Sequence, residues 1–240
     1  MESTGILDFN YVKGAFFYVI PYLKITISLT VLSVILGTVI GIAGAVSELL
    51  HVPVISRLTK GYVLICRSLP NLVLLYLVYY GLPILLLALH EEAGIHLPYE
   101  HISAYLVAVV GLSLHTGAYL TENFRAAIKS VPPGQIEAAK SLGMTWPQIF
   151  QRVIFPQASV FAIPLFANQV LSTMKSTSIV FIITVVEILG AAKLFCEENS
   201  QYFEAYIVVA LLYWGMGILL EFLFSRMEIS LGKFKRGSSI

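Results

Sequence analysis

The chain has 240 residues, of which 58% are hydrophobic and only 12% are charged. Soluble domains carry about 25% charged residues, so the composition excludes a soluble globular protein and predicts an integral membrane protein. The formal net charge of +1 gives no sign of a nucleic-acid partner, and no cluster of cysteine and histidine has the spacing of a metal site.

Apolar runs predict five membrane spans. A hydrocarbon core ~30 Å thick requires about 20 apolar residues in a helix. The second of these runs, Leu69–Leu89, is expected to begin earlier than its apolar residues do, near Lys60, with Arg67 inside the helix. Gly37 and Gly41, in the first run, have the spacing that lets another helix approach closely. The sequence thus predicts an all-α membrane protein with a single domain over residues 1–240. In chain order, the spans are Ile25–Ser47, Leu69–Leu89, Ile102–Thr121, a segment within Val160–Val186, and Tyr206–Leu220.

The distribution of basic residues predicts the orientation of these spans. An odd number of spans places the two termini on opposite sides of the membrane. With the N-terminus outside, the inner segments hold ten Lys and Arg residues and the outer segments hold three. Cytoplasmic segments carry the excess of Lys and Arg. We therefore expect the N-terminus outside, and both the C-terminus and the polar segment 131–157 in the cytoplasm.

A hairpin of two short helices is predicted in that polar segment. The Pro132-Pro133 pair cannot continue a helix, so the third span ends there and a new helix runs over Gln135–Leu142. Gly143 suits the left-handed residue that follows a helix end. Thr145 and Gln148 have the spacing of a capping box, which predicts the start of a second helix.

The surface of this hairpin admits two interpretations. It can be an ordinary connection between spans, because any such loop can hold a short helix. Ala138 and Ala139, however, make a nearly flat helix face suited to a groove on another protein. Trp146 is also too apolar for a loop that faces only water, which favours a partner. The second helix is expected to end at Pro156.

The same segment resembles the EAA motif of ABC-importer permeases. The motif reads EAA-x3-G-x9-I-x-L-P. This chain matches it with Glu137-Ala138-Ala139, then Gly143 after three residues, then VIFP after nine more, with Val153 and Phe155 in place of Ile and Leu. The stretch AYLTENFRAAIKSVPPGQIEAAKSLG is similar to the amino-acid-type permeases, as are FPQA, MKSTS and RSLPNLVLLYLVYYGLP. The segments YLKITISL and LVYYGLP look most like the polar amino acid and cystine branch. The resemblance covers about residues 20–225.

The resemblance implies a type I ABC importer permease in the inner membrane of a bacterial cell. Two permease subunits, identical or merely similar, would form the pathway for an amino acid, which an external substrate-binding protein delivers. Two ATP-binding subunits would bind ATP and Mg²⁺ and receive the EAA hairpin in a groove. This chain has no G-x-x-x-x-G-K-[ST] phosphate loop, so we expect it to be no ATPase and to hold no cofactor. The implied coupling residues are Glu137, Ala138, Ala139, Gly143, Trp146 and Pro156.

Lys175 is the sharpest candidate for the transport pathway, because ionisable residues at membrane depth are costly and usually functional. Ser176, Thr177 and Ser178 follow it, and hydroxyl side chains compete for backbone hydrogen bonds. We therefore expect an irregular or broken helix that lines a cavity. Lys175 would attract a substrate carboxylate or form an internal ion pair. Related permeases have Asp in place of Ser176, which favours a neutral, zwitterionic or acidic substrate here.

Five further polar residues are pathway candidates, each with a structural alternative. Glu122 and Arg125 are three residues apart on one helix face and can pair, either as a salt bridge or as part of a gate. His115 faces the pathway or serves packing through a hydrogen bond. Asn168 is a ligand or a polar contact between helices, and Arg67 lines a gate or is structural.

Two other classes of function compete with the importer. An ion-gradient-driven secondary amino-acid transporter would explain the charges inside the spans but not the cytoplasmic hairpin. An intramembrane enzyme would need a catalytic constellation. The sequence has no H-E-x-x-H, no G-x-S-x-G and no paired membrane aspartates, so we assign no catalytic residue.

Overall fold

The computed structural model describes residues 7–93, 102–197 and 200–237. Every regular element in these ranges is a helix. Five of the described segments are long and apolar enough to cross a bilayer, which confirms the predicted all-α fold with five spans. They are Phe9–Leu49, Asn71–Glu92, Ala104–Lys129, Trp146–Ile183 and Tyr202–Ile229.

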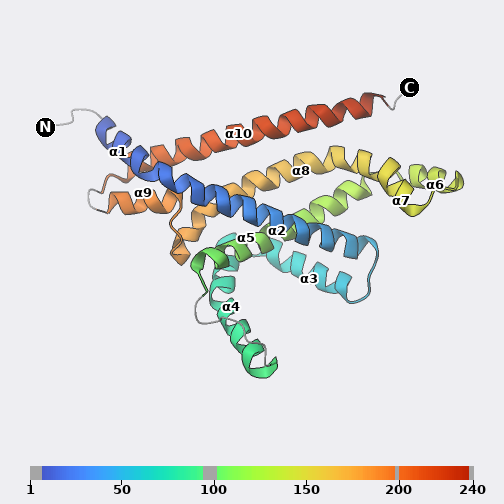
Figure 1. Ribbon diagram of the computed structural model, residues 1–240, viewed down its shortest axis with the longest axis horizontal. Helices are drawn as coiled ribbons and strands as arrows, with labels where there is room; N and C mark the ends of the chain where they lie inside the picture. Colours follow the sequence, from blue (N-terminus) through green and yellow to red (C-terminus); the bar gives the residue numbers. More distant parts are fainter. Residues whose placement is uncertain (1–6, 94–101, 198–199, 238–240) are drawn as a thin grey trace.

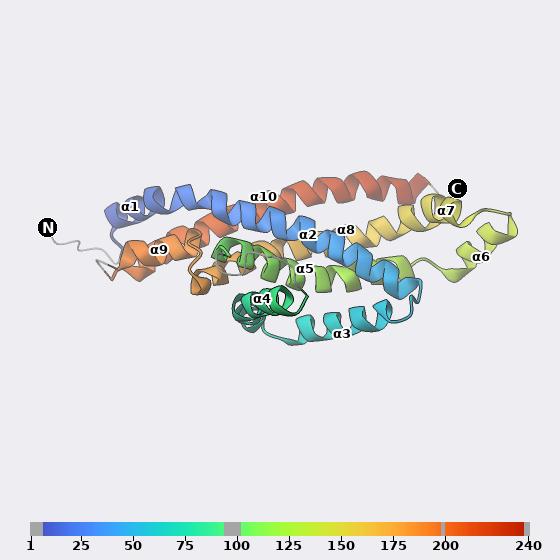
Figure 2. The same ribbon diagram turned by 60° about the horizontal axis from the view of Figure 1, so that its bottom comes forward.

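The first, third, fourth and fifth spans run along one axis, whereas the second span, α4, points away from them (Figure 1). Helices α2, α5, α8 and α10 form the bundle. The short helices α1 and α9 lie at one end, and α6 and α7 lie at the other end with the C-terminus; Figure 2 shows the same arrangement from a second side. The two termini are thus at opposite ends. The bounds are α1 Phe9–Val19, α2 Leu23–Leu49, α3 Ile55–Ser68, α4 Asn71–Ala93, α5 Ala104–Lys129, α6 Pro133–Ser141, α7 Trp146–Ile149, α8 Phe155–Ser176, α9 Ile188–Cys196 and α10 Tyr202–Gly237, with a 3₁₀ turn at Ile20–Tyr22.

Helices α2 and α5 form the tightest pair in the bundle. A Cβ added to Gly41 would lie 2.6 Å from Leu120 Cβ, and one added to Gly37 would lie 2.8 Å from Thr116 Cβ. Neither position has room for a side chain, so the two backbones approach closely at these glycines. The expected close helix contact is confirmed, and its partner is α5.

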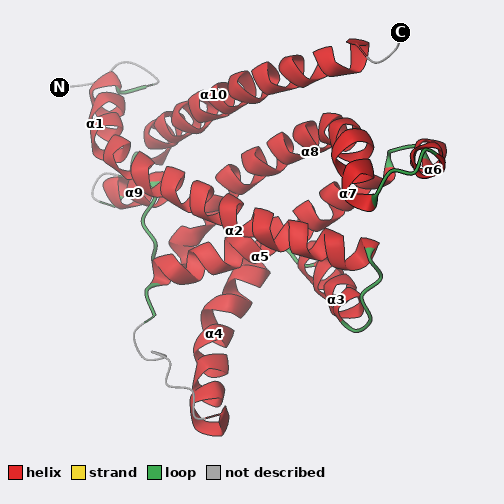
Figure 3. Ribbon diagram, turned by 45° about the vertical axis from the view of Figure 1, so that its right-hand side comes forward, coloured by secondary structure: helices red, strands yellow, loops and turns green. Residues whose placement is uncertain are grey.

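The second span does not begin near Lys60. Helix α3 ends at Ser68, and Leu69 has an extended backbone with φ −83° and ψ 142°. A proline disfavours helical geometry at the residue before it, so Pro70 separates α3 from α4. Arg67 consequently lies in the last turn of α3, outside the span. Figure 3 shows α4 leaving the bundle sideways after this break.

The fourth span includes the second helix of the hairpin. Helix α7 continues through a π-helical segment, Phe150–Ile154, directly into α8, so Pro156 does not end the helix and that prediction is wrong. A proline ring conflicts with the carbonyl four residues earlier in an α-helix. Here the N–H of Phe155 donates to the carbonyl of Phe150, which shifts the hydrogen-bond ladder by one residue before the proline.

The other end of the fourth span is irregular, as expected. Helix α8 ends at Ser176, and a 3₁₀ segment, Thr177–Ile183, follows it. The chain then turns at Thr184, whose φ of 71° is left-handed. The change of helix type therefore begins two residues after Lys175.

Candidate functional site

The hairpin at the α6–α7 end is built as its turn residues predict. Gly143 has a φ of +77°, which confirms the left-handed position between the helices. The N–H of Thr145 donates to Gln148 Oε1 at 2.8 Å, which is the Gln148 half of the capping box. Lys140 Nζ lies 4.7 Å from the centre of the Trp146 ring, so the two helices also meet through a cation–π contact.

The EAA tripeptide does not present a single flat face. Glu137 and Ala138 are exposed, but Ala139 is buried and packs in a cluster with Val131 and Ile149. Ala139 therefore anchors α6 to its own chain, and the expectation that both alanines enter a partner's groove is wrong for this one. Helical geometry is the reason, because neighbouring residues point about 100° apart.

Two large apolar side chains project from the hairpin. Leu142 is 82% exposed and Trp146 is 61% exposed. Sequence reasoning found Trp146 but missed Leu142, which lies directly before the turn glycine. Exposed apolar groups of this size on one hairpin favour a protein partner over water. Gln157 on α8 donates to Gln135 on α6, so the hairpin is also tied to the fourth span.

Lys175 lies on the surface of the last turn of α8, while Thr177 is buried. Thr177 Oγ1 donates to the carbonyl of Met174 at 2.7 Å, and Ser178 Oγ donates to that of Lys175 at 2.8 Å. These side-chain bonds occur where the α-helix gives way to the 3₁₀ segment. Within the described ranges, no acidic side chain forms an ion pair with Lys175, so the internal ion pair is not found.

Asn168 lies on the same side of α8 as Lys175. The two residues are seven apart, which is close to two helical turns, and Ser172 lies between them. All three are exposed in the single chain. We call these three residues the polar stripe of α8.

His115 lies inside the bundle rather than beside the polar stripe. It is buried, its ring centre is 4.9 Å from that of Tyr119, and its Nδ1 has no hydrogen-bond partner in the described part of the chain. Its neighbour Thr116 makes the contact with α8, through a hydrogen bond of 2.8 Å to Thr173. The expected hydrogen bond from His115 is therefore absent from the described residues.

Glu122 and Arg125 pair, as predicted, within a larger ionic cluster. Arg125 donates to both carboxylate oxygens of Glu122, at 3.2 and 2.5 Å. Glu48 Oε2 on α2 lies 3.7 Å from Arg125 Nε, and Arg67 Nη1 on α3 lies 3.8 Å from Glu122 Oε2. The cluster therefore joins α2, α3 and α5. Sequence reasoning missed Glu48, because nothing local distinguishes a buried glutamate at a helix end from a solvated one.

A second buried carboxylate holds together the region around the 3₁₀ segment. Glu187 is fully buried. Its Oε1 accepts from the N–H groups of Leu189 and Gly190, at 2.8 and 3.1 Å, and so caps α9. Its Oε2 accepts from Tyr213 at 2.6 Å and from Thr26 at 3.2 Å.

This carboxylate network reaches the 3₁₀ segment as well. The Tyr213 hydroxyl lies 3.1 Å from Thr177 Oγ1. Four elements, α2, the 3₁₀ segment, α9 and α10, thus meet at Glu187. From sequence, Glu187 reads as a residue at the outer end of the fourth span, which gives no signal of this role.

Comparison with known proteins places the chain in a family. Residues 33–231 match the model of the "Binding-protein-dependent transport system inner membrane component". The chain belongs to this family. It is a multi-pass membrane component of a transport system, in agreement with its five apolar spans.

This inner membrane component is similar to several curated permeases. It is 36% identical over 227 residues to the probable amino-acid permease protein YxeN of Bacillus subtilis (strain 168), a match that covers 95% of this chain and 97% of that one. It is 33% identical over 207 residues to the L-cystine transport system permease protein TcyL of the same organism, covering 86% and 84%.

Solved structures agree with the sequence comparisons. An amino acid ABC transporter solved with histidines matches with a TM-score of 0.79 and 30% identity, over 94% of this chain and 100% of that chain. The inward-facing MetNI methionine ABC transporter, 18% identical with a TM-score of 0.70, supports the fold. The predicted ABC-importer permease is confirmed, and none of these matches supports the secondary transporter.

Proposed function

We propose that this chain forms the translocation pathway for a polar amino acid or cystine in an ABC importer and couples it to a separate ATPase through segment 131–157. The observation that carries the proposal is the hairpin. It exposes Glu137, Ala138, Leu142 and Trp146 at one end of the bundle, while Ala139 fixes it to the chain beneath. The names of the relatives support an amino acid as the substrate.

The orientation of the chain in the membrane and its partner subunits follow from the same proposed role. The hairpin and the C-terminus lie at one end of the bundle and the N-terminus at the other (Figure 1), which fits an N-terminus outside and a cytoplasmic C-terminus. Two ATPase subunits carrying ATP and Mg²⁺ would dock on the hairpins of two permease subunits, and an external binding protein would supply the substrate. The polar stripe of α8, unpaired with any described acid, would then line the pathway.

Reversing the charge of Glu137 tests the coupling. We expect Glu137→Lys to leave membrane insertion intact, because the side chain is exposed, and to lower ATP-driven uptake by about tenfold, equivalent to ~1.4 kcal/mol of docking free energy. Uptake and ATPase activity are measured in proteoliposomes that contain the permease, its ATPase and its binding protein. Glu221→Lys, an exposed reversal on α10, is the matched control.

Two outcomes would contradict the proposed coupling. If the Glu137→Lys variant takes up substrate at the normal rate, the hairpin does not couple the ATPase to transport. Uptake by the unaltered complex that persists without ATP and collapses with an uncoupler would instead favour an ion-gradient-driven transporter.

Removing the Lys175 ammonium tests the pathway. Lys175→Ala is expected to raise the KM for uptake by about tenfold, as loss of one charge-assisted contact does, while ATPase docking to the hairpin stays unchanged. Lys175→Arg keeps the charge and is expected to retain most of the affinity. Unchanged uptake by the alanine variant would reduce Lys175 to a structural role. Both variants are compared by uptake kinetics and by co-purification of the ATPase.

A further inference from the structure

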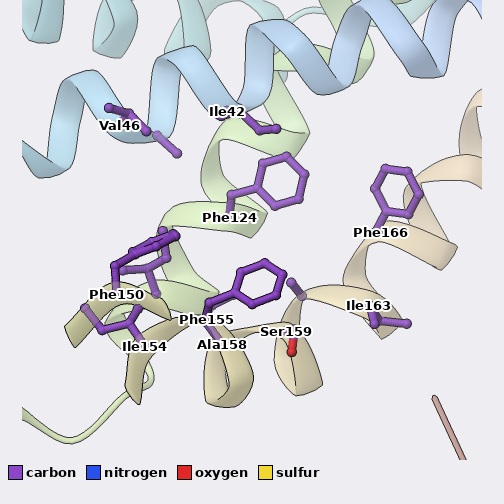
Figure 4. A pocket seen from close by; sticks show the side chains of 14 residues that line it. Ile42, Val46, Phe124, Phe150, Ile154, Phe155, Ala158, Ser159, Ile163 and Phe166 are labelled. Atoms are coloured by element: carbon purple, nitrogen blue, oxygen red, sulfur yellow. The ribbon is translucent and has the colours of Figure 1, made fainter. Parts of the chain in front are cut away.

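The two ends of the bundle differ in what they bury. At the hairpin end, phenylalanine rings and aliphatic side chains line an apolar groove of about 430 Å³, and no titratable side chain is among the described residues that line it (Figure 4). At the opposite end, Glu187 is fully buried and lies between the fourth and the fifth span. A buried carboxyl group is costly to ionise unless a cation compensates its charge.

No cation compensates Glu187 within the described ranges. The side chains that contact it are Thr26 on α2 and Tyr213 on α10, and α9 contributes two backbone N–H groups. Burial raises the pKa of the Glu187 carboxyl, and the hydrogen bonds that it accepts oppose this shift. Other charged or titratable groups of the surrounding elements form neither an ion pair nor a hydrogen bond with Glu187 in these ranges; they are Lys13, Lys24, Lys175, Lys193, Glu204 and Tyr206.

The hydroxyl groups near Glu187 supply too few hydrogens for the contacts that they make. Thr26 and Tyr213 lie 3.2 and 2.6 Å from Oε2 of Glu187. The Tyr213 hydroxyl also lies 3.1 Å from Thr177 Oγ1, which is 2.7 Å from the carbonyl oxygen of Met174. Each of these four contacts needs one hydrogen, but three hydroxyls supply only three. With Glu187 ionised, Thr177 can donate to Met174 or to Tyr213, but not to both.

One proton on Oε2 of Glu187 completes the network. Oε2 then donates to Tyr213, Tyr213 donates to Thr177, and Thr177 donates to the carbonyl of Met174. Thr26 still donates to Oε2, and Oε1, as the carbonyl oxygen of the acid, still accepts from the two N–H groups of α9. The added proton reverses the hydrogen bond to Tyr213 without moving any heavier atom.

We propose that Glu187 is a proton-binding site, and that its proton links Glu187 to the end of α8 through Tyr213 and Thr177. This chain of hydrogen bonds ends at Met174, the residue before Lys175. Loss of the proton leaves one contact of the chain without a hydrogen, which weakens the junction between α8 and the 3₁₀ segment. Thr184, in the turn before Glu187, is exposed. With the proposed orientation, the outer solution supplies the proton; this point alone rests on the proposed function.

Infrared spectroscopy of the full-length permease in nanodiscs tests the proton site. A protonated carboxyl group has a C=O stretching band that an ionised one lacks, and subtracting the spectrum of Glu187→Gln isolates this group. We expect the band at pH about 6, where a glutamate with the ordinary pKa of about 4.3 is ionised. Subtracting the spectrum of Glu197→Gln, an exposed carboxylate at the other end of α9, is expected to reveal no such band. Absence of the band in the Glu187 difference spectrum would overturn the proposal.

Thermal unfolding in detergent tests the same proton through the stability of the fold. A folded-state pKa above the unfolded one stabilises the protein at low pH, and this stability is lost as the pH rises through the folded-state pKa. Glu187→Gln has an amide that donates to Tyr213 at every pH. The Tm of the unaltered protein is therefore expected to fall relative to that of Glu187→Gln between pH about 5 and about 8. A constant difference between the two would contradict the site.

Hydrogen exchange tests the route through Tyr213. Exchange in peptides spanning 174–183 is followed by mass spectrometry and corrected for its intrinsic dependence on pH. In the unaltered protein, we expect protection to fall about threefold between pH about 5 and about 8, because a weaker junction opens more often. Tyr213→Phe removes the connecting hydroxyl and is expected to lose this dependence. Tyr206→Phe, the same change two turns earlier on α10, is the matched control and is expected to keep it.

Two results would overturn the route through Tyr213. One is protection of these peptides that does not change with pH in the unaltered protein, and the other is an unchanged pH dependence in Tyr213→Phe. None of these measurements requires ATP, substrate or a partner subunit. Failure of the proton site is therefore distinguishable from failure of the proposed transport function.

Discussion

Replacing Gly41 with leucine is expected to disrupt the packing of α2 against α5. A Cβ at this position would lie 2.6 Å from Leu120 Cβ and 3.1 Å from the backbone carbonyl carbon of Leu120. A flexible side chain can move away from such a contact, but a helix backbone cannot do so without displacing the whole of α5. Overpacking of a core costs about 1–3 kcal/mol, and occasionally more. We expect Gly41→Leu to exceed that range, because the clash includes backbone.

The measurement is the yield of folded permease in membranes and its thermal unfolding in detergent. Gly217→Leu on α10 makes the same chemical change at a position where a Cβ meets nothing within 4 Å, so its yield and Tm are expected to match the unaltered protein. Equal Tm values for the Gly41 and Gly217 variants would show that the α2–α5 contact is looser than the structure indicates.

Replacing Glu187 with alanine is expected to destabilise the region that carries Lys175. The change removes the acceptor of four hydrogen bonds, two from the start of α9 and two from the hydroxyls of Thr26 and Tyr213. A buried donor left without an acceptor costs about 1–3 kcal/mol. Because Tyr213 also contacts Thr177, the 3₁₀ segment loses support, and we expect reduced uptake as well as a lower Tm.

Two controls distinguish this network from a general effect of losing a carboxylate. Glu187→Gln keeps an oxygen that can accept from the α9 N–H groups, so a smaller loss of stability is expected. Glu197→Ala removes an exposed carboxylate at the other end of α9 and is expected to leave the Tm unchanged. A Glu187→Ala protein that unfolds at the same temperature as the Glu197→Ala protein would contradict the network.

Features set by neighbouring residues were predictable from the sequence. The spans follow from apolar length, the turn at Gly143 from the freedom of glycine at positive φ, and the irregular end of the fourth span from the hydroxyls after Lys175. The pairing of Glu122 with Arg125 follows from their helical spacing. Each of these depends on residues that are contiguous in the sequence: about 20 for a span, and fewer than about eight, the reach of two helical turns, for the others.

Features set by distant residues were not predictable. Glu187 bonds to Thr26, which is 161 residues away in the sequence, and Glu48 meets Arg125 from another helix. The burial of Ala139 depends on how α6 rests on α7 and the π-helical segment. Pro156 was misread for a related reason. The effect of Pro156 on the helix depends on the π-helical turn before it, and no residue pattern in the sequence predicts that turn.

The continuity of the fourth span has a mechanical consequence. From Trp146 to Lys175 the chain has no non-helical interruption, so at 1.5 Å per residue roughly 44 Å of rod connects the hairpin to the polar stripe. A rod transmits a push or a twist over its whole length, whereas a jointed loop would absorb it. Within this rod, the π-helical segment, where the hydrogen-bond ladder changes, and Pro164, which removes one hydrogen bond from α8, are places where it can bend. A force applied at the hairpin would therefore be transmitted to the region of Lys175 through one continuous helical segment.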